Sequence, residues 1–181
     1  MWKQEFVRFL RQRWIWVLLA AFSLATGLFT GLATAGGLPA ERLSALVGGV
    51  RGGAVTVPGF MLFMRMWLTN VQTLAIVWLC AYTRFGIPLS VGALWLRGMV
   101  LGFSISVGWR ASILLSLGLT LTTLLLSALL CAAAAVAFPL SASRFHRNAP
   151  VPVHPTRPMV FLLICTIPIA ILECVLLPVA G

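Results

Sequence analysis

The feature that most constrains this chain is an uncharged apolar run at residues 111–138, "ASILLSLGLTLTTLLLSALLCAAAAVAF". The run has 28 residues, whereas a helix of about 20 apolar residues is enough to cross the ~30 Å hydrocarbon core of a bilayer. A run of this length therefore predicts a membrane-spanning helix that either tilts or begins in the interfacial layer.

The rest of the chain has the same character. Of its 181 residues, 61% are hydrophobic and 9% are charged, while a soluble domain is about 25% charged. A soluble core of this length could not bury so much apolar surface, so lipid must cover much of it. We expect an all-α fold, a polytopic transmembrane helical bundle in which residues 1–181 form a single membrane domain. The sequence predicts about five spans, at residues 14–35, 66–83, 87–109, 111–138 and 159–179.

Two segments between these spans differ from them in pattern. We expect residues 36–65 to be external or interfacial and to contain a short amphipathic helix, because Leu43, Leu46, Val47 and Val50 follow the i, i+3, i+4, i+7 spacing. Glycine and proline interrupt the apolar stretch that follows, and a sixth span at 44–64 is the alternative. Residues 139–158 are rich in proline and arginine, a composition typical of an extended cytoplasmic loop.

Basic residues set the expected orientation. The chain has 13 Lys and Arg against three acidic residues, a net charge of +10. Such an excess between spans marks the cytoplasmic side, so we interpret it as topology and expect no nucleic-acid partner. With five spans and a cytoplasmic N-terminus, eight basic residues lie inside and four outside, whereas six spans would place the basic proline-rich loop outside. The inside set is Lys3, Arg8, Arg11, Arg13, Arg84, Arg144, Arg147 and Arg157, and the outside set is Arg42, Arg51, Arg65 and Arg110.

The N-terminal region has the order of a secretory signal peptide, with basic residues before an apolar stretch from Trp14 to Ala35. That stretch is near 20 residues, longer than the 7–15 apolar residues of a signal peptide. We therefore expect an uncleaved first span.

Two residues of opposite charge lie inside predicted spans. Arg97 is near the middle of the third span, where an arginine costs about 2.5–3.5 kcal/mol on insertion scales, and Glu173 is in the fifth. These spans run in the same direction, and the two residues differ by ~6 Å in depth at 1.5 Å per residue. We predict an intramembrane charge pair that fixes the register of the helices, with an ion or proton relay as the alternative function. Separate partners for each charge, either water or the polar span residues Asn70 and Gln72, are the alternative geometry.

Small residues recur every four positions in two spans. Gly27, Gly31 and Ala35 form one row in the first span, and a second row occupies the third span. Such rows let helix backbones approach closely in lipid. We expect tight packing of these two spans, against each other or against a partner. The second row consists of Gly98, Gly102 and Ser106.

Catalytic signals are weak. The chain contains no aspartate, its three glutamates are scattered, and His146 and His154 lie in the proline-rich loop without carboxylate neighbours. We therefore predict no catalytic residue, no metal site and no cofactor. Ser104 and Ser106 are expected to bond to the helix backbone, and an intramembrane enzyme would need a polar cavity around one of them. The four cysteines form no CxxC pair, so we expect neither a disulfide framework nor a metal site built from them.

The segment "RFGIPLSVGALWLRGMVLGFSISVGW", together with "ILECVLLPVAG" and "LTNVQTLAIVWL", resembles the stage II sporulation protein M family. The opening Gly86-Ile87-Pro88 matches the start of the family's pattern. The family's pattern continues with a basic residue, which corresponds here to Arg97. A GxxxGF stretch follows, and it corresponds to Gly98, Gly102 and Phe103. An acidic residue followed by proline in the last span corresponds to Glu173 and Pro178, and Asn70 lies at the expected place in the second span. The resemblance extends from about residue 65 to the C-terminus.

The resemblance implies a bacterial plasma (inner) membrane protein without enzymatic activity. In that family the named member anchors membrane-associated peptidoglycan hydrolases during sporulation. We accordingly expect a scaffold whose partners are the lipid bilayer and cell-wall hydrolases, with a homo-oligomer left open. The alternative is a transporter or transporter-permease subunit in which Arg97 and Glu173 line a pathway.

Overall fold

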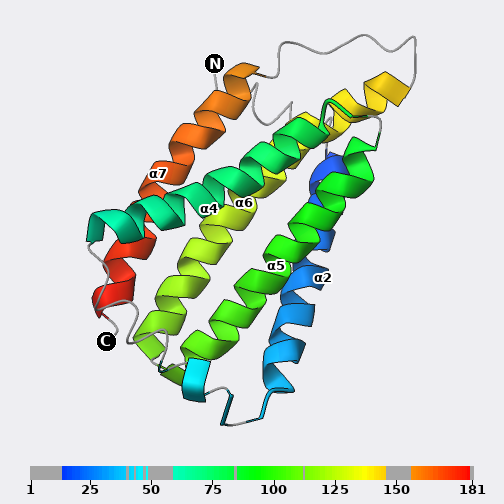
Figure 1. Cartoon of the computed structure of the whole chain (residues 1–181). Helices are drawn as coiled ribbons and strands as arrows, with labels where there is room; N and C mark the ends of the chain where they lie inside the picture. The colour runs from blue at the N-terminus through cyan, green and yellow to red at the C-terminus, as the bar shows by residue number, and fades with distance from the viewer. Residues whose placement is uncertain are drawn as a thin grey trace.

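Five long helices make up most of the described chain (Figure 1). The structure is a computed structural model that describes residues 14–39, 41–42, 44–46, 48, 59–83, 85–111, 113–145 and 156–179. Each long helix contains a stretch that is long and apolar enough to cross a membrane. The predicted all-α polytopic bundle with five spans is therefore confirmed. The helices are α2 (Trp14–Gly36), α4 (Gly59–Cys80), α5 (Gly86–Ala111), α6 (Ile113–Phe145) and α7 (Thr156–Val179).

Successive helices run in opposite directions, so α2 begins and α7 ends at opposite ends of the bundle (Figure 1). We call the end where α2 begins the proximal end, and the end where α2 and α5 finish the distal end. Helices α2 and α5 lie side by side, α6 occupies the centre, and α4 crosses the bundle obliquely between α7 and α5. An odd number of crossings in this order is what a five-span topology requires.

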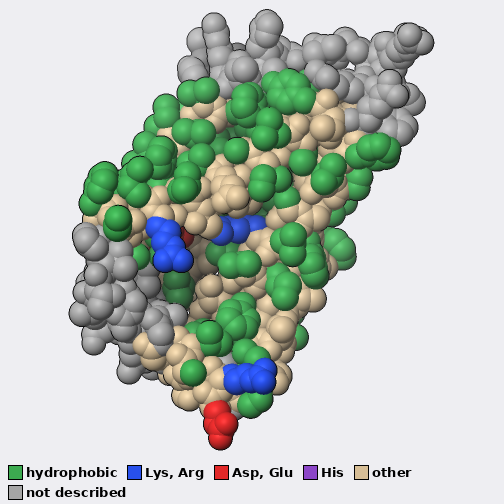
Figure 2. Space-filling view, viewed as in Figure 1, with side chains coloured by type: hydrophobic (Ala, Val, Ile, Leu, Met, Phe, Trp, Pro, Cys, Tyr) green, Lys and Arg blue, Asp and Glu red, His purple; other side chains and the backbone are tan. Residues whose placement is uncertain are grey.

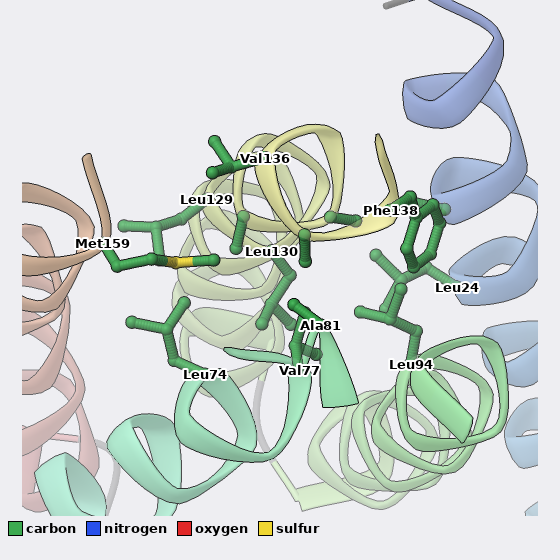
Figure 3. Packing of buried hydrophobic residues seen from close by; sticks show 14 of the residues in the cluster. Leu24, Leu74, Val77, Ala81, Leu94, Leu129, Leu130, Val136, Phe138 and Met159 are labelled. Atoms are coloured by element: carbon green, nitrogen blue, oxygen red, sulfur yellow. The ribbon is translucent and has the colours of Figure 1, made fainter. Parts of the chain in front are cut away.

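The apolar core lies mainly in the proximal half of the bundle. Buried side chains from all five long helices meet there, and Figure 3 shows Leu94 of α5 beside Val77 of α4 and Phe138 of α6. Most of the central span of α6 is buried, whereas less than a third of each of the other four spans is buried. The exposed positions carry large apolar side chains, among them Phe22, Phe29 and Phe161. This distribution suits a bundle surrounded by lipid.

Helix α4 begins earlier than the sequence suggested. It starts at Gly59, seven residues before the expected Met66, and ends at Cys80 rather than Thr83. Pro58 and Gly59 are the last helix breakers here, and the largely apolar stretch that follows contains no further glycine or proline up to Cys80. Residues 59–65 therefore belong to a span and not to an external segment, which is incompatible with a separate span over 44–64.

The rest of the predicted external segment is only partly described. Residues 41–42, 44–46 and 48 are helical. Three of the four positions that define the predicted amphipathic face, Leu43, Val47 and Val50, lie outside the described residues, as do 49–58. The amphipathic helix therefore stays a prediction.

Helix α6 also exceeds its predicted end. It passes through Pro139 and continues to Phe145, although a proline lacks the N–H of a helical hydrogen bond. Helices packed in a membrane tolerate this loss because neighbouring groups satisfy the freed backbone. The hydroxyl of Ser141 donates to the carbonyl of Thr83 at 3.1 Å and ties this part of α6 to the α4–α5 turn. The predicted loop at 139–158 is shorter as a result, because α7 begins at Thr156, and residues 146–155 lie outside the described part.

Candidate functional site

A polar network joins α4, α5 and α7 within the bundle. The guanidinium Nη2 of Arg97 donates to Oδ1 of Asn70, and Nδ2 of Asn70 donates to Oε2 of Glu173 at 3.1 Å. Asn70 is almost completely buried, while the two charged side chains are half-buried. The carboxamide thus offers an acceptor to the cation and a donor to the anion at once.

The predicted direct pair between Arg97 and Glu173 is not formed. Among the described residues, each of the two charged groups contacts Asn70, and no ion pair joins them. The physical reason is the helix arrangement: α4 packs against both α5 and α7, whereas α5 and α7 share little interface. A residue of α4 therefore lies between the two charges. Asn70 serves both of them, while Gln72 has an exposed side chain on α4 and takes no part.

The network leaves part of the arginine unpaired. Nε of Arg97 is buried without a hydrogen-bond partner in the described structure. Glu173 bonds to Asn70 through one carboxylate oxygen only. Both charged groups therefore keep hydrogen-bonding capacity that the described protein does not fill.

A cavity of about 360 Å³ lies against this network. Figure 2 shows a hollow in one face of the molecule, with basic and acidic side chains at its rim. Met66, Leu101 and Val107 supply apolar wall, and hydroxyl groups add polar atoms. The hydroxyl-bearing residues are Thr69, Ser104, Thr122 and Thr123.

The two rows of small residues meet each other across α2 and α5. A Cβ atom added at Gly27 or Gly31 would lie within 3.0 Å of backbone atoms of α5, at Trp95 and Met99 respectively. In return, a Cβ at Gly98 or Gly102 would meet the backbone of α2 at equally short range. Each helix therefore lies in the notch left by the glycines of the other, and a hydrogen bond of 2.7 Å from the Ser23 hydroxyl to the Val91 carbonyl adds to the contact.

The last residues of the two rows of small residues differ in how far they are buried. Ala35 is completely buried, in keeping with its row, whereas Ser106 is half-exposed. Because the four glycines are used within the chain, they are not available for a partner helix.

Other candidate chemistry is sparse. None of the four cysteines forms a disulfide. Groups of three or more metal-ligating side chains are absent from the described residues, while His146 and His154 lie outside them. Ser104 lines the cavity, but its hydroxyl donates to the carbonyl of Val100 at 2.9 Å and not to a base.

No known family, no curated protein and no solved structure matches this chain. The site must therefore be interpreted from its own geometry.

The sequence did not predict the cavity or two further contacts between helices, one a hydrogen bond and the other a close approach at a glycine. Nε1 of Trp67 in α4 donates to the hydroxyl of Thr166 in α7 at 3.1 Å, and Gly86 lies so close to Cys80 and Ser141 that a Cβ would not fit. Polar residues at 67 and 166 are 99 positions apart, so their pairing has no local signal. The cavity has none either, because it depends on the oblique path of α4.

Proposed function

We propose that this chain is a non-enzymatic membrane scaffold that anchors partner proteins in the plasma membrane, with its N-terminus in the cytoplasm. The observation that carries the proposal is that Asn70 bridges the two charged residues in the spans, Arg97 and Glu173. A bridge of this kind holds three helices in register. Beyond it, toward the proximal end, the described core is apolar and contains no acidic, basic or histidine side chain.

The resemblance to the stage II sporulation protein M family supports the same role and suggests the partners. Membrane-anchored cell-wall hydrolases would be held against a rigid bundle whose α2–α5 pair is locked by reciprocal glycine contacts. Recruitment would use the outer helix faces and the segment between α2 and α4.

The test is affinity purification in a mild detergent with identification of co-purifying proteins. Cell-wall hydrolases are the expected result. An ATPase subunit recovered in their place would contradict the scaffold and support a permease subunit.

A transporter is the second candidate, because Arg97, Asn70 and Glu173 all line the cavity of about 360 Å³. The substitution Glu173→Gln separates the two functions. In a scaffold it lowers stability or partner assembly, since it leaves the arginine without its counter-charge. In a proton-coupled carrier the variant folds normally and loses flux.

A further inference from the structure

The bundle has two unlike halves that meet at the polar network. On α5, the buried Leu94 belongs to the apolar core, while the residues that line the cavity begin at Arg97 and end at Gly108. On α6 the order along the chain is reversed, because Thr122 and Thr123 line the cavity and Leu126 and Leu130 belong to the core. Since α5 and α6 run in opposite directions, both helices place the cavity in the distal half and the core in the proximal half.

The other two helices agree with this division. Met66 and Asn70 of α4 border the cavity, while Leu74 and Val77 lie in the core. On α7, Met159 and Ile169 lie in the core and Glu173 faces the cavity. The cavity extends to Gly108, close to the distal end of α5 at Ala111. The cavity therefore extends from the network toward the distal end, where Leu46 of the segment between α2 and α4 also borders it.

We propose that this cavity is a water-filled vestibule in the distal half of the bundle that ends at Arg97, Asn70 and Glu173. Purely apolar cavities stay dry; the wall of this one is mostly apolar, but its inner end carries Arg97, Asn70 and Glu173, and such groups hold water that bonds to otherwise unpaired polar atoms. Glu173 uses one carboxylate oxygen and Arg97 one nitrogen within the protein, so both have capacity for such water. The vestibule supplies solvation to a charge that would otherwise be costly at this depth.

The apolar core makes the vestibule one-sided. Leu94, Val77, Leu126 and Leu130 are at most 2% exposed and close the bundle beyond the network, as Figure 3 shows for Leu94, Val77 and Leu130. Water and small polar solutes thus reach the network from one side of the membrane. This inference does not depend on the scaffold role, because either a scaffold or an occluded carrier could contain it.

The test uses two serines of the same helix as a matched pair. In a full-length chain with the four native cysteines replaced, Ser104→Cys places a thiol in the vestibule and Ser90→Cys places one in the sealed half, where Ser90 is buried. A membrane-impermeant, positively charged methanethiosulfonate is applied from either side of sealed membrane vesicles. Leu121→Cys, exposed on the outer face of α6, controls for thiols that face lipid.

We expect Ser104→Cys to react about tenfold or more faster than Leu121→Cys, because the reactive thiolate forms only in contact with water. The reaction should occur from the distal side only, and Ser90→Cys should not react from either side. Failure of Ser104→Cys to react, or reaction of Ser90→Cys from the proximal side, would overturn the vestibule. Neither result would bear on co-purification of partners, so the two proposals fail separately.

Discussion

At the scale of single residues, one neutral side chain bonds to both charged residues of the network. Asn70 accepts from Arg97 and donates to Glu173, so its carboxamide acts as a relay between groups that helix packing keeps apart. An uncharged residue thus decides whether the charged ones are tolerated in the bundle.

Replacing Asn70 by an apolar residue should lower the stability of the bundle. We expect Asn70→Leu to lower the free energy of unfolding in detergent by about 1–3 kcal/mol, because it leaves buried polar groups of Arg97 and Glu173 unpaired. Gln72→Leu, on the exposed side of the same helix, is the control and should change stability by less than about 0.5 kcal/mol. Denaturant titration of both variants measures the difference, and equal losses would contradict the role of Asn70.

The two charges should also be coupled energetically although they do not touch. In a double-mutant cycle of Arg97→Met and Glu173→Gln, we expect the double variant to lose less stability than the sum of the single variants. The reason is that each single change leaves one uncompensated charge, which the double change removes. An interaction free energy of about 0.5–3 kcal/mol is expected from the same titration; strictly additive losses would show that the network does not couple them.

At the scale of helices, the closest contact is the one between α2 and α5. Four glycines lie against the backbone of the opposite helix, and no side chain separates the two axes there. Dispersion contacts between backbones replace the hydrophobic effect, which has little force between helices in lipid.

A single methyl group in this contact should force the helices apart. We expect Gly98→Ala to lower the free energy of unfolding by about 1–3 kcal/mol, because the new Cβ would overlap the carbonyl of Leu24. The matched control is Gly92→Ala on the same helix, where nothing lies within 4 Å of the added Cβ. It should leave stability unchanged or raise it by up to about 1 kcal/mol, since alanine favours the helix over glycine. Thermal unfolding in detergent compares the two, and an equal response would contradict close packing at Gly98.

At the scale of the whole molecule, the alternating helices place the start of α2 and the end of α7 at opposite ends. In a membrane this arrangement puts the start of α2 and the end of α7 on opposite sides. The basic residues of the N-terminal segment then favour the cytoplasm for the proximal end.

Reporter fusions test this orientation. We expect alkaline phosphatase fused after Gly181 to be active, because that enzyme folds only outside the cytoplasm, and a fluorescent protein fused at the same point to be dark. The same two reporters fused after Thr83, in the turn before α5 at the proximal end, provide the control and should give the opposite pair of signals. A cytoplasmic signal after Gly181 would rule out an odd number of spans.

The sequence by itself determined the class of the protein and the number of its crossings, because long uncharged runs can bury their backbone only as helices in lipid. It also singled out the residues of the network and the glycine rows, since charge and small size are visible in the chain. The sequence did not show which residues these would contact. That the glycines pack against each other, that Asn70 stands between Arg97 and Glu173, and that a cavity lies beside them follow from how α4 crosses between α5 and α7. The network joins residues that are 27 and 103 positions apart in the chain. Such contacts depend on the angles at which helices cross, and a local sequence pattern does not determine those angles.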